Sequence, residues 1–142
     1  MNLFLDCEFN GFGGSLISMA LVDENQHYFY EVLACESPIP WVETHVMPQL
    51  NQPVIEWEQF QWKLRHFLQG YQHVHIIADW PEDLSLFLNA LIVHPGSHMA
   101  VPALTMALWK PTQNDHFIDA KQPHNALSDA IALQKNYQSM NK

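Results

Sequence analysis

Three short apolar runs open the chain, and each has the length and composition of a β-strand. They cover residues 3–8, 15–22 and 27–34, and aromatic and β-branched side chains dominate the third run. A glycine-rich turn separates the first two runs, and a polar turn at residues 23–26 separates the second from the third. Because links this short join antiparallel neighbours, the pattern predicts a three-stranded antiparallel meander.

Residues 38–53 contain several prolines and predict an irregular segment or a short helix. Helical spacing of apolar residues begins after this stretch. Residues 55–69 carry apolar side chains at helical spacing and precede a glycine, so they predict an amphipathic helix. Residues 74–78 form a short apolar run that predicts a central strand, and residues 82–92 return to helical spacing. A last helix is predicted at residues 125–139.

The segment between the last two predicted helices is less regular. Residues 101–109 are ambiguous between helix and strand, whereas Phe117 and Ile118 predict a short strand. The order β-β-β-α-β-α-β-α predicts an α/β fold whose mixed sheet starts as an antiparallel meander, continues into parallel strands and is flanked by helices. No repeat, low-complexity tract or linker interrupts the 142 residues, so a single domain at residues 1–142 is expected.

Composition favours a compact protein, since 48% of the residues are hydrophobic and 15% are charged. The apolar runs fall short of the roughly 18 to 20 residues of a membrane span, and no leader of basic and apolar segments precedes the first predicted strand. A soluble cytoplasmic protein is therefore expected. Cys7 and Cys35 lack CxxC spacing, so both are expected to be reduced, buried packing residues.

The charge of the chain limits how it can bind nucleic acid. The formal net charge is −9 at pH 7, and affinity for a phosphate backbone normally comes from Lys and Arg residues that release counterions. The basic residues form no stripe and number six: Lys63, Arg65, Lys110, Lys121, Lys135 and Lys142. A polynucleotide would therefore be held at its end, by metal ions and a few local contacts, rather than along a groove.

Two acidic residues on the first predicted strand are the strongest chemical signal. Asp6 and Glu8 are two residues apart, and side chains at this spacing lie on the same face of a strand. Two carboxylates held this close repel each other, which raises the pKa of one of them unless a cation lies between them. Hard oxygen ligands suit Mg²⁺ and Mn²⁺, so the pair predicts a carboxylate metal site.

Three further acids and a histidine lie where such a sheet gathers functional groups. Asp79 and Asp83 follow the predicted central strand, and Asp129 lies in the last helix, preceded by His124. Each has an ordinary explanation when taken alone: Asp79 closes a turn, Asp83 favours a helix N-terminus, Asp129 lies on a polar helix face and His124 starts a helix. Together, in this order along the chain, they indicate a metal-dependent site.

The motif order resembles the DEDDh 3′-to-5′ exonucleases of the ribonuclease H-like fold, particularly the branch similar to ribonuclease T and oligoribonuclease. The resemblance covers nearly the whole chain. Residues 124–129, His-Asn-Ala-Leu-Ser-Asp, together with Ala130, match the family pattern H-x-A-L-x-D-A at every fixed position. After the Asp6-x-Glu8 motif, the stretch Phe9-Asn10-Gly11 is similar to the family segment that lets the backbone approach the terminal nucleotide.

The middle motif departs from the family pattern. The family usually has a histidine-asparagine pair followed, a few residues later, by Phe-Asp. On this chain Asp79 takes the asparagine position, Glu82 takes the phenylalanine position and Asp83 takes the position of the catalytic aspartate. Asp83 is the preferred ligand, and Asp79 is the alternative.

The resemblance implies a two-metal phosphodiester hydrolase that uses Mg²⁺ or Mn²⁺. It places Asp6, Glu8, Asp83 and Asp129 as metal ligands and catalytic residues, and His124 as the general base. The expected reaction is 3′-to-5′ exonuclease cleavage of single-stranded RNA or short oligonucleotides, which releases nucleoside 5′-monophosphates. A DNA-directed exonuclease, and a weakly active or inert nucleic-acid-binding or regulatory module of the same fold, are the alternatives. Relatives often pair, so a homodimer is also expected.

Overall fold

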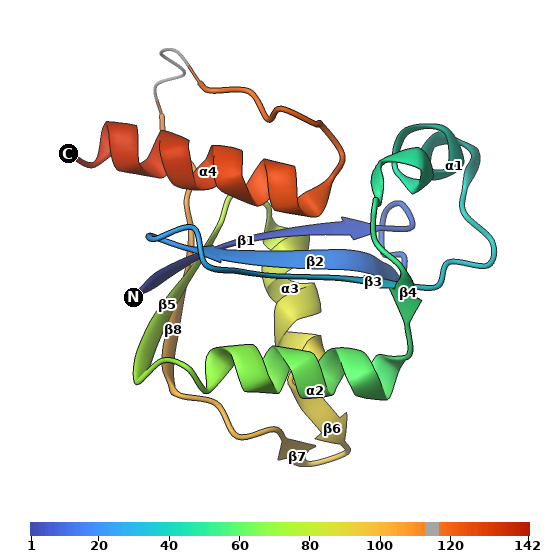
Figure 1. Ribbon diagram of the computed structural model, residues 1–142, viewed down its shortest axis with the longest axis horizontal. Coiled ribbons are helices and arrows are strands. Elements are labelled where there is room, and N and C mark those ends of the chain that lie inside the picture. Colours follow the sequence, from blue (N-terminus) through green and yellow to red (C-terminus); the bar gives the residue numbers. More distant parts are fainter. Residues whose placement is uncertain (113–116) are drawn as a thin grey trace.

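A computed structural model describes residues 1–112 and 117–142, and one mixed six-stranded sheet dominates it (Figure 1). The strand order is β4-β3-β2-β1-β5-β8. The sheet strands are β1 (Asn2–Phe9), β2 (Leu16–Asp23), β3 (Tyr28–Leu33), β4 (Val54–Ile55), β5 (His73–Ala78) and β8 (Ala103–Leu108). Strands β6 (Ile92–His94) and β7 (Ser97–His98) form a separate hairpin. The helices are α1 (Pro40–His45), the 3₁₀ turn η1 (Met47–Gln49), α2 (Trp57–Leu68), α3 (Pro81–Ala90) and α4 (Ala126–Met140).

The predicted antiparallel meander is confirmed. Strand β1 pairs antiparallel with β2 along nearly its whole length, and β2 pairs antiparallel with β3. Strands β5 and β8 then extend the sheet in parallel, as the predicted crossovers require. The sequence therefore predicted the mixed α/β sheet and its change from antiparallel to parallel strands.

The pairing of β1 with β5 is short, so the second half of β1 has an open edge on its β5 side. Only Asn2, Leu3 and Phe4 are paired with β5. Asp6 and Glu8 lie beyond the last of these pairs, where β1 keeps only its β2 partner. The second half of β1 therefore faces a space that the β5–α3 turn can enter.

Helices cover both faces of the sheet and seal two apolar layers (Figure 1). On one face, Phe60 and Leu64 of α2 and Phe87 of α3 are fully buried against the strands. On the other face, α4 presents Ala126 and Ala130, both fully buried. Side chains this small let the helix axis approach the sheet closely, and this brings the neighbouring position of α4, Asp129, near β1.

Two segments differ from the predicted pattern. The ambiguous residues 101–109 contain the edge strand β8, which pairs with β5 along its whole length. Phe117 and Ile118, predicted as a strand, form none. The side chain of Asn136 explains this: its Oδ1 accepts from the backbone N–H of Ile118 at 2.6 Å, and its Nδ2 donates to the Ile118 carbonyl at 2.9 Å. Helix α4 thus takes the place of a strand partner.

Both cysteines are free thiols, as expected. Cys7 is buried as predicted, whereas the prediction of burial is wrong for Cys35, which is half-buried. Among the helices of residues 1–112 and 117–142, none combines the length and the apolar character that crossing a bilayer requires.

Candidate metal centre

Five carboxylates from three parts of the chain converge at the open edge of β1. Asp6 belongs to two groups: one with Asp79 and Asp83, the other with Glu8 and Asp129. Within each group the candidate ligand oxygens lie within 4.8 Å of one another. Asp6 is thus the common member, placed between the middle of the chain and its last helix.

Strand geometry accounts for the first pair. Asp6 and Glu8 project from the same face of β1, and Cys7 between them projects to the opposite face, where it is buried in the core. The predicted sharing of a face is therefore confirmed. The bulge between Glu8 and Phe9 then ends the regular pairing with β2 directly after the second carboxylate.

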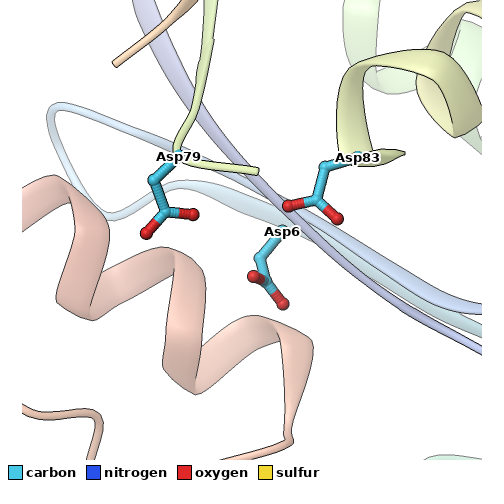
Figure 2. A group of neighbouring side chains, drawn as sticks. All are labelled: Asp6, Asp79 and Asp83. Carbon is cyan, nitrogen blue, oxygen red and sulfur yellow. The ribbon is translucent and has the colours of Figure 1, made fainter. Parts of the chain in front are cut away.

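The middle of the chain contributes two acids rather than one. Asp79 directly follows β5 and is exposed, whereas Asp83 lies in the first turn of α3 and is 2% exposed. Figure 2 shows both carboxylates reaching toward Asp6, from the end of the strand and from the start of the helix. The choice between Asp79 and Asp83 that the sequence posed is therefore not exclusive, because the turn at Pro81 brings both to one place.

A network of hydrogen bonds fixes the start of α4. Asn125 is the N-cap, and its Oδ1 accepts from the backbone N–H of Ser128 at 3.0 Å. Its Nδ2 donates to the Gln49 carbonyl at 2.7 Å and to the Tyr30 hydroxyl at 3.3 Å. The Ser128 hydroxyl accepts from the backbone N–H of Gln122 at 2.8 Å. The variable positions of the C-terminal motif are thus anchors that join α4 to η1 and β3.

His124 and Asp129 are held together by the backbone. The N–H of His124 donates to Asp129 Oδ2 at 3.1 Å, and His124 adopts a left-handed conformation with φ of 66°. This conformation is uncommon for a residue other than glycine and is often found at functional sites. The bond orients the Asp129 carboxylate, which also forms a hydrogen bond with Glu8.

The His124 ring packs against two aromatic rings of α1 that were not singled out from the sequence. It lies edge-on to Trp41, with centroids 5.1 Å apart, and 6.2 Å from His45. Trp41 and His45 are stacked at 4.6 Å, one helical turn apart. Their spacing of four residues was the available signal, but the helix has six residues and its apolar period is too short to recognise.

The turn between β1 and β2 joins the strand that carries Asp6 and Glu8 to this aromatic cluster. Asn10 Oδ1 accepts from the backbone N–H of Ile39 at 2.9 Å, and its Nδ2 donates to the Ser37 carbonyl at 3.0 Å. Gly11 has φ of +74°, and a Cβ there would lie 2.7 Å from Ile39 Cδ1. The positive φ favours glycine at this position, and the two Asn10 hydrogen bonds hold the segment leading into α1 beside the end of β1.

Burial and mutual repulsion disfavour the charged form of the carboxyl groups in this cluster. Burial raises the pKa of Asp6 well above its ordinary range, and the nearby Asp83, Asp129 and Glu8 raise it further. Burial, followed by the charge of Asp129 and a hydrogen bond with it, raises the pKa of Glu8 to about 8. Burial and the charges of Asp79 and Glu8 raise the pKa of Asp83 to about 8, although a backbone hydrogen bond from Cys7 lowers it.

The same crowding fits a divalent cation. Asp6 Oδ2 is buried and has no hydrogen-bond partner among the residues that the structure describes. Such an atom is costly unless a ligand satisfies it, and a set of carboxylate oxygens is the donor type that Mg²⁺ and Mn²⁺ prefer. A cation in each group would neutralise the repulsion and use Asp6 as a shared ligand. The donor set therefore fits the predicted pair of metal ions.

No family model matches the sequence, and the search of curated proteins returned no significant match. The function has to be inferred from the positions of the side chains and from their order along the chain.

Proposed function

We propose that the protein is a metal-dependent 3′-to-5′ exonuclease of the ribonuclease H-like fold that acts on single-stranded RNA or short oligonucleotides. One observation carries the proposal: Asp6 is shared by two carboxylate groups to which β1, the β5–α3 turn and α4 each contribute. These three segments supply the acids in the order of the DEDDh motifs. The antiparallel-to-parallel sheet with α4 packed across β1 and β2 also supports it.

The ligand assignment follows the two groups. Asp6, Glu8 and Asp129 would hold one Mg²⁺ or Mn²⁺, and Asp6, Asp79 and Asp83 would hold the other. When bound, such ions supply charge neutralisation at phosphorus and activation of the attacking water. The protein supplies the spacing, because the carboxylates come from a sheet, a turn and a helix that pack against one core.

His124 is the proposed general base. Its backbone is tied to Asp129, and its ring is half-buried beside Trp41, at the rim of the carboxylate cluster. An imidazole in this place can take a proton from the attacking water and return it to solvent. The packing with Trp41 and His45 restricts the orientation of the ring, so the proton acceptor is positioned before substrate binds.

The direct test is a time course with 5′-labelled single-stranded RNA and DNA oligomers and each metal ion. We expect stepwise shortening from the 3′ end, release of nucleoside 5′-monophosphates and no reaction in EDTA. Asp6→Asn is the matched control, since it keeps the side-chain shape and removes the shared ligand. Intact RNA and DNA with both Mg²⁺ and Mn²⁺ would rule out the exonuclease.

One observation favours a second candidate, a weakly active or inert nucleic-acid-binding module of the same fold. Asp79 stands where the DEDDh family usually has asparagine, and it adds a fifth carboxylate to the cluster. An extra negative charge beside the reacting phosphate would weaken substrate binding. This candidate requires that the protein bind labelled oligomers in Mn²⁺ without shortening them.

A further inference from the structure

Two exposed side chains meet beyond the paired ends of β5 and β8, the edge where Asp79 lies, and have no role in the mechanism above. Lys110 Nζ lies 5.1 Å from the centroid of the Trp80 ring, within the range of a cation–π contact. Trp80 is 51% exposed, and Lys110 is also exposed. Trp80 directly follows Asp79 and therefore belongs to the same β5–α3 turn as the acids of the middle segment.

The pairing of β5 with β8 determines where Trp80 and Lys110 lie. Strands β5 and β8 are parallel, with Ala78 opposite Leu108, and the backbone N–H of Trp109 donates to the Ala78 carbonyl at 2.8 Å. Because parallel strands end at the same edge, the residues that follow them leave the sheet together. Trp109 packs edge-on to Tyr137 of α4, with centroids 5.4 Å apart.

The backbone at Trp80 is fixed as well. It is extended, with φ of −129° and ψ of 131°, and the next residue, Pro81, begins α3. Trp80 thus directly precedes α3, with its backbone position set by the end of β5 and the start of the helix. A large apolar ring that is half in water beside a polar site is better suited to a ligand than to the core.

Charge favours a polyanion as that ligand. The chain carries −9 overall, and the cluster itself would repel phosphate, so a substrate needs a cation close by. Lys63 is paired with Glu31 at 2.9 Å, and Lys121 and Lys135 line a separate cavity between β3 and α4. Lys110 is the basic residue that the β5–β8 register carries to the edge where Asp79 lies.

We propose that Trp80 and Lys110 form a subsite for single-stranded nucleic acid next to the metal centre. Trp80 stacks on a base upstream of the 3′-terminal nucleotide, and Lys110 binds the adjoining phosphate. In the free protein the ammonium group lies over the indole. When nucleic acid binds, the contact between Lys110 and Trp80 is lost. A base then stacks on the Trp80 ring, and a phosphate contacts the Lys110 ammonium group. The proposal rests on the exonuclease function, since the site it adjoins sets the position of the 3′ end.

Binding tests the subsite without turnover. The probe is a fluorescein-labelled eight-nucleotide strand with phosphorothioate linkages, in RNA and DNA forms, titrated with the full chain in Mg²⁺ and followed by anisotropy. Base stacking is worth roughly 1–3 kcal/mol, so Trp80→Ala is expected to raise Kd by about 5- to 150-fold. Trp80→Phe, which keeps an aromatic face, is expected to recover part of the affinity.

Salt dependence tests Lys110 separately. Each phosphate contact on a single strand contributes about 0.7 to the slope of log K against log salt. Lys110→Gln is expected to reduce the slope by about that amount, and Lys110→Arg to keep it. A purely structural role for Lys110 would weaken binding, if at all, without changing the slope.

Matched controls lie on α2, outside the acidic cluster. Trp62 is 63% exposed and stacks on His66, so Trp62→Ala removes an equally prominent indole. Arg65→Gln removes one positive charge from the same helix. Both are expected to keep the wild-type Kd and slope.

Three outcomes decide the proposal. If Trp80→Ala binds as Trp62→Ala does, or Lys110→Gln keeps the wild-type slope, the subsite is overturned, whether or not the protein cuts nucleic acid. If both effects appear on the phosphorothioate probe while unmodified RNA and DNA strands of the same sequence stay intact with Mg²⁺ and Mn²⁺, the subsite holds and the exonuclease proposal fails. Should Trp80→Ala unfold, as its far-UV circular dichroism would reveal, Trp80→Phe and Lys110→Gln decide the question.

Discussion

The backbone N–H of His124 donates a hydrogen bond of 3.1 Å to Oδ2 of Asp129, five residues later in the chain. The proposed base and a proposed metal ligand are therefore positioned by one bond. The left-handed φ of His124 is the backbone conformation in which this bond is made. A substitution at His124 can therefore act in two ways: it can remove the imidazole, or it can change the backbone conformation that holds Asp129.

Replacing His124 tests this separation. His124→Asn is expected to keep the backbone conformation, because asparagine tolerates positive φ, and to slow hydrolysis by roughly 10²- to 10⁴-fold by removing the base. The stabilisation of the protein by Mn²⁺ should persist in this variant. Rates on a labelled oligomer and thermal melts with and without Mn²⁺ measure the two properties. Wild-type rates would exclude His124 as the base.

Asp6→Asn is expected to abolish hydrolysis and, in EDTA at pH 8, to make the protein more stable. The substitution removes a buried charge that has no partner and that four other acids repel. A gain in the free energy of unfolding is expected, because burial and the neighbouring acids raise the pKa of Asp6 well above its usual range. Urea denaturation measures it. A loss of stability would contradict the picture of a strained acidic cluster.

Stability of the metal-free protein is expected to fall between pH 5 and pH 8. The pKa of Glu8 rises from its ordinary 4.5 to about 8 on folding, and that of Asp83 from 3.8 to about 8. In this window the folded state binds more protons than the unfolded state, so the free energy of unfolding decreases as pH increases. Stabilisation is complete below the unfolded values and is lost as pH rises through about 8. Urea midpoints in EDTA at pH 5, 6.5 and 8 measure the trend, and Glu8→Gln should flatten it.

Mn²⁺ and Mg²⁺ are expected to reverse this loss. An ion at 100 times its Kd stabilises the folded state by about 2.7 kcal/mol per site, and protons compete with it for the same oxygens. The rise in Tm should therefore be larger at pH 8 than at pH 5. Thermal melts with metal or EDTA at both pH values check this. Asp6→Asn should show little or no rise, and an equal rise in that variant would place the ions elsewhere.

The two acids of the middle segment, Asp79 and Asp83, are expected to contribute unequally to kcat/KM. Asp83 is buried and Asp79 is exposed, so water can replace the Asp79 carboxylate more easily. Asp83→Asn is expected to lower kcat/KM by at least about 100-fold, whereas Asp79→Asn, which restores the asparagine usual in the family, should keep at least about a tenth of it. The reverse order would identify Asp79 as the principal ligand.

The hydrophobic pattern was sufficient to predict the sheet and its main helices. Period-two and short apolar runs predicted β1, β2, β3 and β5, and helical spacing predicted α2, α3 and α4 within a few residues. Asp6 and Glu8 were predicted to share a face for the same reason, since strand geometry alone fixes it. Sequence periodicity is therefore sufficient to predict features that depend on the geometry of a single strand or helix.

Features that depend on two elements could not be predicted. Phe117 and Ile118 have the composition of a strand, but a side chain of α4 binds the backbone of Ile118 and no strand forms there. Likewise, Asp79 and Asp83 looked like alternatives on the linear sequence. The turn between β5 and α3 brings both to Asp6, which only three-dimensional packing reveals. RNA preference and homodimer formation stay predictions.

The early end of the β1–β5 pairing has a consequence for how activity arises during folding. The carboxylates that meet at that opening come from residues 6, 79 and 129, so the last helix must dock before the acids can meet. Contacts this distant in sequence form late, because closing long loops is entropically costly. On the proposed function, a nascent or partly folded chain would lack the complete carboxylate cluster and would not hydrolyse nucleic acid.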